Sequence, residues 1–518
     1  MCQKKYEPLW IIFITFVGKS IAMKARPIIS FILTAAALSA AAQTLEIKKQ
    51  VLPNPNNEPA PVFPVPSERQ MKWNETEFYA FFHYGMNTYT DKEWGNGDEP
   101  ETLFAPTEAP DPRQWLEAIK AAGMKGGIAV VKHHDGFCLW PTATTTHNVT
   151  NSGNPLGEAT NIPRDFADAA RDLDLKYGFY ISPWDRNSAF YGDGTNRYVN
   201  DVFLKQAQEL AKYGSDQFEM WFDGANGGTG YYGGANEARS IDNSTYYNVP
   251  NLRDKIHAMA PDCVMWGVGG EARWIGNEAG WAGETCWSMG NGTSGNENEW
   301  LWHPGESDAK ATHSGWFWHR DDDMRSLDNL WKFYLETVGR NATLILNIPP
   351  NRSGKLPQAY VDTLTAFGQR LQERLGTDLA PKAHVTASTT RRAGASRNYE
   401  ASNLIDGDKD TYWATDDSIT AATVTLMWDN PVNLHYVALQ EYIRKGQRIK
   451  DFIIEGTADG VNWQRMAPDV TTSTVGYKRI IPLNGSTEVY GPGYDLRGVR
   501  VTVNDAKAAP LLHTISAY

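Results

Sequence analysis

The sequence is poor in cysteine, with four among 518 residues. Three of them, Cys138, Cys263 and Cys286, follow the N-terminal region, and none of these forms a CxxC pair. Disulfide scaffolds use a dense, even set of cysteines, and thiolate zinc sites use closely spaced pairs, so both are excluded. We expect the three thiols to lie in the core.

An excess of positive charge is also absent. The chain carries 49 Lys and Arg against 61 Asp and Glu, a formal net charge of −12. It therefore lacks the electrostatic footprint of a nucleic-acid-binding protein, and a neutral substrate fits better. Aromatic residues make up 12% of the chain, which excludes a disordered chain.

Long hydrophobic runs are missing beyond the N-terminus, so no membrane span is expected there. Within residues 1–42, a short basic start at 23–26 precedes an apolar run at 27–38 and a cluster of small residues. This order is typical of a secretory signal, and we expect cleavage after Ala42 and an exported protein, periplasmic or secreted. One long signal anchor is the alternative.

No GxGxxG motif or phosphate loop opens any of the expected helices, which weakens the case for a doubly wound open sheet. Residues 43–68 are expected to form an extended lead-in, and in residues 69–378 short apolar strands alternate with amphipathic helices. This alternation favours an α/β fold with a (β/α)8-type barrel. The expected strands lie within 77–85, 126–136, 176–184, 217–224, 263–269 and 342–350, and the expected helices within 112–123, 164–175, 202–214, 251–260 and 327–339.

The pattern changes near residue 379. Residues 379–518 contain short β-like runs separated by turn residues, and helical periodicity disappears. Such spacing predicts a second, all-β sandwich domain.

Polar and aromatic residues follow four of the expected barrel strands. In a barrel of this kind the catalytic groups lie at the carboxyl ends of the strands, so we expect these residues to share one site. They are His83 after the first strand, His133, His134 and Asp135 after the second, Tyr180, Ser182 and Trp184 after the third, and Trp221 and Asp223 after the fourth.

Two carboxyl groups are the requirement for acid/base chemistry on a glycosidic bond. Asp223 follows two aromatic residues and precedes glycine, so it is the first candidate, although Asp before Gly is also a common turn. The tryptophan-rich segment 270–287 offers Glu271, Glu278 and Glu284, and burial beside Trp would raise the pKa of a glutamate as a general acid requires. The residues by themselves do not choose among the three.

Four motifs resemble those of glycoside hydrolase family 29, the retaining α-L-fucosidases. They are FHYGMNTYTDKEW at 82–94, KHHDGFCLWPT at 132–142, YGFYISPWDR at 177–186 and MWFDGA at 220–225. Two further segments, at 273–280 and 315–319, resemble the branch that prefers α-1,3/1,4-linked fucose. The resemblance covers about residues 69–375.

This resemblance implies a fucosylated glycan as substrate, with Asp223 as nucleophile and Glu278 as acid/base. The residues that it implies as fucose contacts are His83, Glu93, Trp94, His133, His134, Tyr180, Trp221, Arg273 and Trp316. No catalytic metal or cofactor is expected, since adjacent residues on a strand, such as His133 and His134, point to opposite faces. A catalytically silent glycan-binding protein and a retaining glycosidase for another sugar are the alternatives.

The C-terminal domain resembles discoidin-like, factor V/VIII C-type modules, which include family 32 carbohydrate-binding modules. The motif is SNLIDGDKDTYWAT at 402–415, with FIIEGTADGVNW downstream. Such modules often hold a structural Ca²⁺, for which the resemblance suggests Asp406 and Asp408. A solvated acidic turn is the alternative.

Overall fold

A computed structural model describes residues 54–518 of the chain. The predicted signal and its cleavage site after Ala42 lie outside the described residues. Among the described residues, no helix has the length and apolar character needed to cross a membrane.

Eight parallel strands form the sheet of the first domain, hydrogen-bonded in the order β7-β4-β3-β2-β1-β10-β9-β8. A parallel bridge between Trp266 and Ala272 joins the two edges of the sheet and closes it into a barrel. A doubly wound sheet would stay open, so the barrel prediction is confirmed. The strands are β1 (Phe78–Phe82), β2 (Gly126–Lys132), β3 (Lys176–Ile181), β4 (Glu219–Phe222), β7 (Val264–Gly267), β8 (Arg273–Trp274), β9 (Gly305–Lys310) and β10 (Ala342–Asn347).

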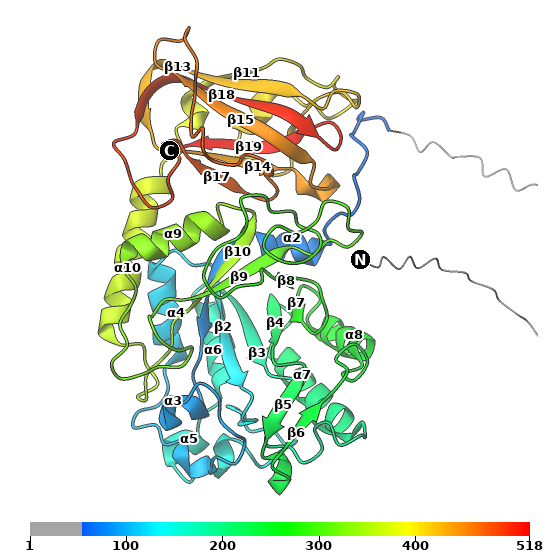
Figure 1. Cartoon of the computed structure of the whole chain (residues 1–518), viewed down its shortest axis with the longest axis vertical. Coiled ribbons are helices and arrows are strands. Elements are labelled where there is room, and N and C mark those ends of the chain that lie inside the picture. The colour runs from blue at the N-terminus through cyan, green and yellow to red at the C-terminus, as the bar shows by residue number, and fades with distance from the viewer. Residues whose placement is uncertain (1–53) are drawn as a thin grey trace, which may run out of the picture. The chain divides into compact units, whose positions relative to one another are not determined.

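Helices occupy most of the connections between the strands (Figure 1). The longer ones are α4 (Pro112–Ala121), α6 (Ile162–Asp172), α7 (Leu204–Ala211), α8 (Val249–Met259), α9 (Leu327–Thr337) and α10 (Gln358–Leu375), while α2 (Glu68–Asn74) precedes β1. Helix α4 shows how the local sequence starts a helix. The Asp111 side chain accepts a hydrogen bond from the backbone amide of Gln114, and Pro112 occupies the first turn. From β7 through β9, a stretch that the structure describes throughout, loops replace the helices.

Each of the six expected barrel strands and five expected helices corresponds to an observed element, but β8 and β9 have no counterpart among the expectations. Strand β9 is buried although its sequence, GESDAK, carries Glu306, Asp308 and Lys310. Charged residues are depleted in strands, so the local pattern gave no indication of it.

The second domain is a sandwich of two antiparallel sheets, as predicted, with strand orders β11-β13-β18-β15-β16 and β12-β19-β14-β17. Inward-facing residues of both sheets, such as Phe452 and Leu512, form its core. The strands are β11 (His384–Ala387), β12 (Trp413–Ala414), β13 (Ala422–Leu434), β14 (Tyr436–Glu441), β15 (Ile449–Thr457), β16 (Gln464–Arg465), β17 (Arg479–Pro482), β18 (Tyr494–Ala506) and β19 (Leu511–Ala517).

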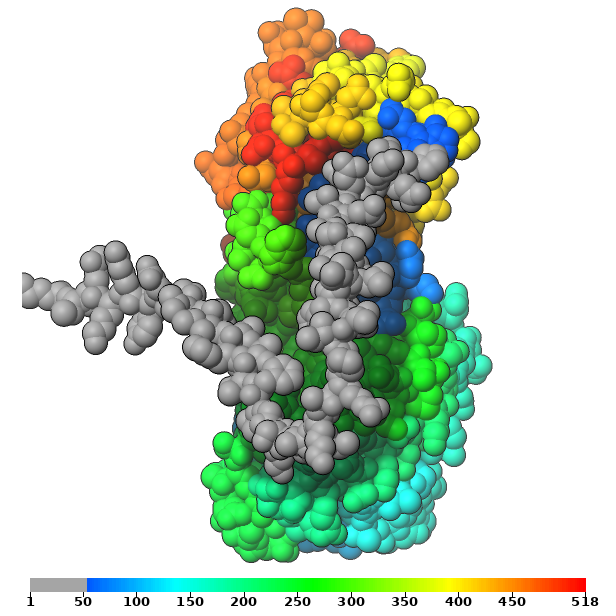
Figure 2. All heavy atoms as spheres, turned by 90° about the vertical axis from the view of Figure 1, so that its right-hand side faces the viewer, coloured from blue at the N-terminus to red at the C-terminus, as the bar shows by residue number. Residues whose placement is uncertain are grey.

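The sandwich, the barrel and the end of the lead-in belong to one compact unit, Pro55–Tyr518. Buried polar contacts join the two domains: the Ser288 amide donates to Gln447 Oε1 at 2.7 Å, and the Tyr477 amide donates to Asn341 Oδ1 at 2.7 Å. The described end of the lead-in lies against the yellow part of the sandwich (Figure 2), where Tyr399 donates to the Asn56 carbonyl at 2.6 Å.

The acidic turn of the sandwich binds its own backbone. Asp406 Oδ1 accepts from the Asp408 amide at 2.8 Å, and Asp408 Oδ1 accepts from the Asp410 amide at 2.9 Å. Within residues 54–518, no group of three or more His, Cys, Asp or Glu side chains could hold a metal ion. These contacts are those expected of the alternative, a solvated acidic turn, and the Ca²⁺ site stays a prediction.

The three cysteines of the described chain are buried and unpaired, as expected.

Candidate active site

A cavity of about 860 Å³ opens beside the carboxyl ends of β4 and β7. Asp223 and Glu278 both line it, and aromatic, glycine and small polar residues form the rest of its wall. The other lining residues are Trp94, His134, Trp184, Phe222, Gly224, Ala225, Asn226, Gly227, Gly228, Thr229, Asn243, Ser244, Val249, Gly267, Val268, Gly269 and Gly270.

Asp223 directly follows β4, and the glycine after it fixes the direction of its carboxylate. Gly224 has a φ of 72°, and a Cβ at this position would lie 2.5 Å from His134 Cε1, so only glycine fits. The Gly224 amide donates to Asp223 Oδ1 at 2.6 Å, and the Tyr180 hydroxyl donates to Oδ2 at 3.3 Å. The Asp-Gly pair therefore serves as a turn that presents the carboxylate to the cavity.

Burial raises the pKa of Asp223, the two hydrogen bonds lower it, and the negative charge of Glu278 raises it further; the net change is upward. The side chain still exposes 47% of its surface, because it faces the open cavity. The carboxylate is thus reachable by a substrate and surrounded by protein on its other sides. The effect of Glu278 means that the two carboxyl groups lie within electrostatic range of each other.

Glu278 lies on the loop that follows β8, and it is exposed where it lines the cavity. The two glutamates that compete with it in the sequence have other partners. Glu271 accepts from Arg69 at 2.8 Å and from the Met265 amide at 2.9 Å, and Glu284 accepts from the Thr471 amide of the sandwich. Of the three, Glu278 is the one that lines the cavity together with Asp223.

The histidines His83, His133 and His134 cluster beside Asp223. The rings of His133 and His134 lie 4.1 Å apart, and those of His83 and His133 lie 5.9 Å apart. Burial lowers the pKa of His83 and of His134 to about 3, and lowers that of His133 well below its ordinary value. All three are therefore neutral at physiological pH, each with one donor and one acceptor nitrogen.

Partners behind two of these rings fix their tautomers. Asn347 Nδ2 donates to the Trp316 carbonyl, so its Oδ1 accepts from His83 Nδ1 at 2.7 Å. The Ser182 hydroxyl donates to the Trp184 carbonyl at 2.7 Å, so Ser182 Oγ accepts from His134 Nδ1, also at 2.7 Å. His134 Nε2 is left as an acceptor 3.9 Å from Asp223 Oδ2, a spacing that a sugar hydroxyl can bridge.

Aromatic rings form one wall of the cavity. Trp94 exposes 57% of its surface and lies edge-on to both His134 and Trp184, with ring centroids 5.2 and 5.7 Å away. Exposed indole faces suit the apolar face of a sugar ring.

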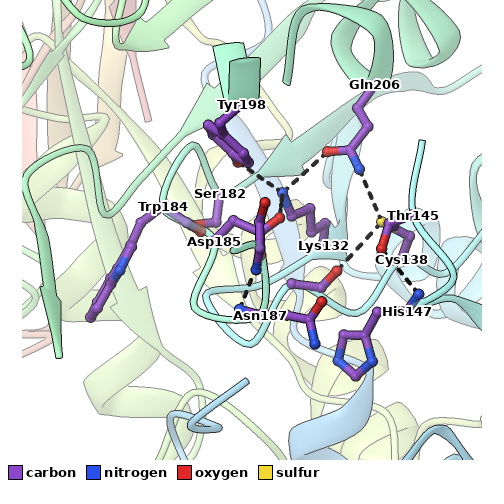
Figure 3. A network of polar contacts seen from close by, with 12 residues as sticks. Lys132, Cys138, Thr145, His147, Ser182, Trp184, Asp185, Asn187, Tyr198 and Gln206 are labelled. Carbon is purple, nitrogen blue, oxygen red and sulfur yellow. Dashed lines mark hydrogen bonds and ion pairs between the residues drawn. The ribbon is translucent and has the colours of Figure 1, made fainter. Parts of the chain in front are cut away.

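The loop that carries Trp184 is anchored by a buried ion pair (Figure 3). Lys132 Nζ lies 2.7 Å from Asp185 Oδ2, and neither side chain exposes more than 3% of its surface. Tyr198 and Gln206 also accept from the ammonium, each at 3.1 Å. Trp184 points away from this network, so the ion pair holds the base of the aromatic wall.

Glu93, Trp221 and Trp316 do not line the cavity, and the same holds for His83, His133 and Tyr180. Glu93 accepts from the Trp316 amide at 2.6 Å, and the Trp316 ring packs against His83 with centroids 5.2 Å apart. Trp221 is buried, with its ring stacked on Tyr180 at 5.7 Å. These residues support the histidines and Tyr180.

Arg273 does not reach this cluster. Its guanidinium is buried and donates to the carbonyls of Gly292 and His303, at 3.1 and 2.5 Å, and to the thiol of Cys286. These contacts hold the loop between β8 and β9, and Arg273 does not line the cavity.

Several residues at or near the site were not predicted from the sequence. Asn347, which orients His83, ends the apolar run of β10, so the polar-after-apolar signal used for four other strands would have found it. Asn226 and Thr229 lie on and beside the hairpin of β5 (Gly227–Gly230) and β6 (Glu237–Ser240), whose glycine-rich sequence resembles an ordinary loop. Glu306 and Asp308 lie in the unpredicted strand β9.

A barrel that brings two carboxyl groups, a neutral histidine and the indoles of Trp94 and Trp184 to one cavity, with two more neutral histidines close by, defines a glycoside hydrolase. The family model for α-L-fucosidases matches residues 61–374, and that for the F5/8 type C domain matches residues 384–509. The chain belongs to the α-L-fucosidase family, glycoside hydrolase family 29, and carries a C-terminal discoidin-like module.

Relatives of known sequence and structure agree with this assignment. Alpha-L-fucosidase 1 of Arabidopsis thaliana is 33% identical over 476 residues, covering 89% of this chain and 88% of its own. A glycoside hydrolase 29 family member from an unknown rumen bacterium is 37% identical, with a TM-score of 0.75 over 88% of this chain and 78% of its own. A Ruminococcus gnavus GH29 fucosidase, solved as a mutant in complex with fucose, is 30% identical, with a TM-score of 0.76 over 89% and 96% of the two chains.

Proposed function

We propose that this α-L-fucosidase releases terminal α-1,3/1,4-linked fucose from oligosaccharides or glycoconjugates, with Asp223 as nucleophile and Glu278 as acid/base. The observation that carries the proposal is that these two carboxyl groups line one cavity, where the charge of Glu278 raises the pKa of Asp223.

Asp223 is suited to attack because its charged form is held in place. The Gly224 amide and the Tyr180 hydroxyl each bind one of its oxygens, which favours the carboxylate against the cost of burial. Both donors come from rigid positions, the turn after β4 and strand β3. The carboxylate is therefore oriented before the substrate arrives.

In the first step, an oxygen of Asp223 forms a bond to the anomeric carbon of fucose as the bond from that carbon to the glycosidic oxygen breaks. Glu278 gives its proton to the departing oxygen, so a covalent fucosyl-enzyme forms and the remaining glycan leaves. In the second step, Glu278 removes a proton from water, the water oxygen bonds to the anomeric carbon, and Asp223 is released as carboxylate. Two inversions give net retention.

The neutral histidines bind sugar hydroxyls without carrying charge. His134 Nε2 accepts, and the Asp223 carboxylate beside it accepts as well, so a hydroxyl between them donates to one of the two. The exposed indole of Trp94 supplies an apolar surface for the sugar, including the C6 methyl group that distinguishes fucose from galactose.

The linkage preference is supported by two features. The segment 273–280 resembles the α-1,3/1,4-preferring branch, and Glu278 lies within it. The cavity, at about 860 Å³, is near the upper end of the range for ligand pockets, about 300–1,000 Å³. It offers room for sugar units beyond fucose, which a branched acceptor requires.

Asp223→Ala tests the nucleophile. We expect fucose release from a Lewis-type trisaccharide to fall by on the order of 10⁴-fold or more, as when other covalent enzymes lose their nucleophile. Added azide should restore part of the rate on an aryl fucoside and yield β-fucosyl azide. Undiminished turnover by this variant would refute the assignment.

A substrate panel tests specificity. We expect the wild-type enzyme to cleave α-1,3- and α-1,4-fucosylated oligosaccharides faster than α-1,2-linked ones, and nitrophenyl α-L-fucoside faster than other nitrophenyl glycosides. Proton NMR should show α-fucose as the first anomer released. Faster cleavage of α-1,2 linkages would overturn the linkage preference, and faster cleavage of another glycoside would overturn the sugar specificity.

We also propose that the protein is exported and that catalysis proceeds without a metal or other cofactor. Both follow from the sequence pattern and from the roles assigned above. N-terminal sequencing of the mature protein tests the first, with Gln43 as the expected first residue.

A further inference from the structure

Strand β9 brings two carboxyl groups into the interior of the barrel that the mechanism above does not use. Glu306 and Asp308 are two residues apart and therefore face the same side of the strand. Their exposed fractions are 1% and 4%. Burying a carboxyl group costs free energy of folding unless the group is hydrogen-bonded, so the hydrogen-bond partners of Glu306 and Asp308 indicate their role.

Each of the two carboxyl groups accepts a hydrogen bond from an indole. Trp221 Nε1 donates to Glu306 Oε1 at 2.7 Å, and Trp274 Nε1 donates to Asp308 Oδ1 at 2.8 Å. Trp274 is the last residue of β8, and Glu278 follows four residues later. Asp308 therefore binds the start of the loop that carries Glu278.

The same loop is attached to β9 at both ends. The Ile275 amide donates to the Glu306 carbonyl at 2.8 Å, and Ala279 forms an antiparallel bridge with Ala309. Within residues 54–518, no residue forms a hydrogen bond with the Glu278 side chain. The position of that carboxyl group thus depends on how firmly the loop is held.

We propose that Asp308 is a positioning residue for the acid/base: by binding the Trp274 indole, it fixes the loop that presents Glu278 to the glycosidic oxygen. This inference rests on the role proposed for Glu278. It assigns to Asp308 an effect that acts through the loop, without contact to the substrate.

The charge state of Asp308 fits this role. Burial raises the pKa of Asp308 well above its ordinary value, the Trp274 hydrogen bond lowers it, and the charge of Glu278 raises it. The contact itself requires only an oxygen that accepts from the indole of Trp274. Asparagine presents an equivalent carbonyl oxygen, so Asp308→Asn should preserve the contact and Asp308→Ala should remove it.

The test compares substrates that need the acid to different degrees. For Asp308→Ala and Trp274→Phe, we expect kcat/KM on a fucosylated trisaccharide to fall by about 10²-fold, at the lower end of general-acid effects. On an aryl fucoside with a good leaving group, whose departure needs little protonation, the fall should stay below about threefold. Glu278→Ala should show the same pattern more strongly, and Asp308→Asn should remain within about threefold of wild type on both substrates.

Trp428→Phe is the matched control, because Trp428 Nε1 also makes a partly buried hydrogen bond, to the Leu379 carbonyl at 2.9 Å, but in the module. It should lower Tm without any dependence on the leaving group. Equal losses on both substrates for the Asp308 and Trp274 variants, or no loss, would overturn the proposal. If Asp308→Ala does not fold, Trp274→Phe decides. Failure of the wild-type enzyme to release fucose from either substrate would instead refute the proposed function.

Discussion

The hydroxyl of Tyr180 lies 3.3 Å from Oδ2 of Asp223 and donates to it across neighbouring strands. Tyr180 is paired in register with Trp221, two residues before Asp223, so the parallel sheet sets this contact. The hydrogen bond lowers the pKa of Asp223, while burial and the nearby carboxylate raise the pKa of Tyr180 well above its ordinary value. Tyr180 therefore stays protonated and remains a donor over the working pH range.

Removing the Tyr180 hydroxyl should reduce the fraction of Asp223 that is ionised, and therefore nucleophilic, at acidic pH. In Tyr180→Phe the ring remains, but the pKa of Asp223 rises, so the acidic limb of the kcat/KM profile shifts to higher pH. A hydrogen bond to a charged group contributes about 1.5–3 kcal/mol, which corresponds to about 10–150-fold in rate if the bond is made fully in the transition state. A pH profile with an aryl fucoside measures both effects. An unchanged acidic limb would show that Tyr180 does not bind the ionised nucleophile.

Glu306→Gln should change the pH dependence of stability. Burial and the neighbouring Glu219 raise the pKa of Glu306, so its contribution to stability is present below the unfolded pKa of about 4.3 and is lost as pH rises through the folded value. Glutamine does not ionise and keeps an oxygen for Trp221. The free energy of unfolding of the variant, relative to wild type, should therefore increase from pH 5 to pH 8, by at most about 1.4 kcal/mol per pH unit.

Denaturant unfolding at several pH values measures this difference, and Glu455→Gln supplies a control of opposite sign. The pKa of Glu455 is lowered, chiefly by its hydrogen bond with Arg500, so its stabilisation is present above the unfolded pKa and is lost as pH falls. That variant should be less stable than wild type at neutral pH and approach it in acid. If the difference in unfolding free energy between Glu306→Gln and wild type does not change with pH, the raised pKa of Glu306 is contradicted.

Gln447→Ala should weaken the attachment of the module without affecting catalysis. The buried Gln447 side chain accepts from the Ser288 amide at 2.7 Å and donates to the Cys286 carbonyl at 3.1 Å. Leaving these buried groups unpaired costs about 1–3 kcal/mol of unfolding free energy. Chemical denaturation and kcat/KM measure the two effects, with the exposed Gln464→Ala as a control. A change in kcat/KM without loss of stability would contradict a purely structural interface.

Ca²⁺ should have little effect on the enzyme. Asp406 and Asp408 already accept from the backbone amides of their own turn. We expect Tm and kcat/KM to be the same in excess EDTA and in millimolar Ca²⁺, and Asp406→Asn to lower Tm equally in both. A rise in Tm with Ca²⁺ that Asp406→Asn abolishes would establish the metal site instead.

Six of the eight barrel strands were predictable because their signals are local. Apolar runs such as residues 342–347, separated by amphipathic segments, report burial on both faces of a parallel sheet wherever they occur. The turn at Asp223 and Gly224 is also encoded locally, because the positive φ of Gly224 sets the direction of the Asp223 side chain. The polar residues at strand ends gave Asp223 and the histidines, and the resemblance to a known family added the roles expected of them.

Other features depended on closure of the barrel. The residue pattern left three glutamates equivalent, and the family resemblance pointed to Glu278. The fold brings Glu278 to the cavity that Asp223 lines and leaves Glu271 and Glu284 with other partners. The same closure takes Arg273 away from the cavity.

The sequence by itself determined the class of fold, the family and the aspartate at the end of β4, because each is encoded in short stretches of neighbouring residues. The tertiary structure alone decided that Glu306 and Asp308 are buried and bound by indoles. Their strand reads as a polar loop until the barrel encloses it, since the partners that make burial of these carboxyl groups tolerable come from other strands.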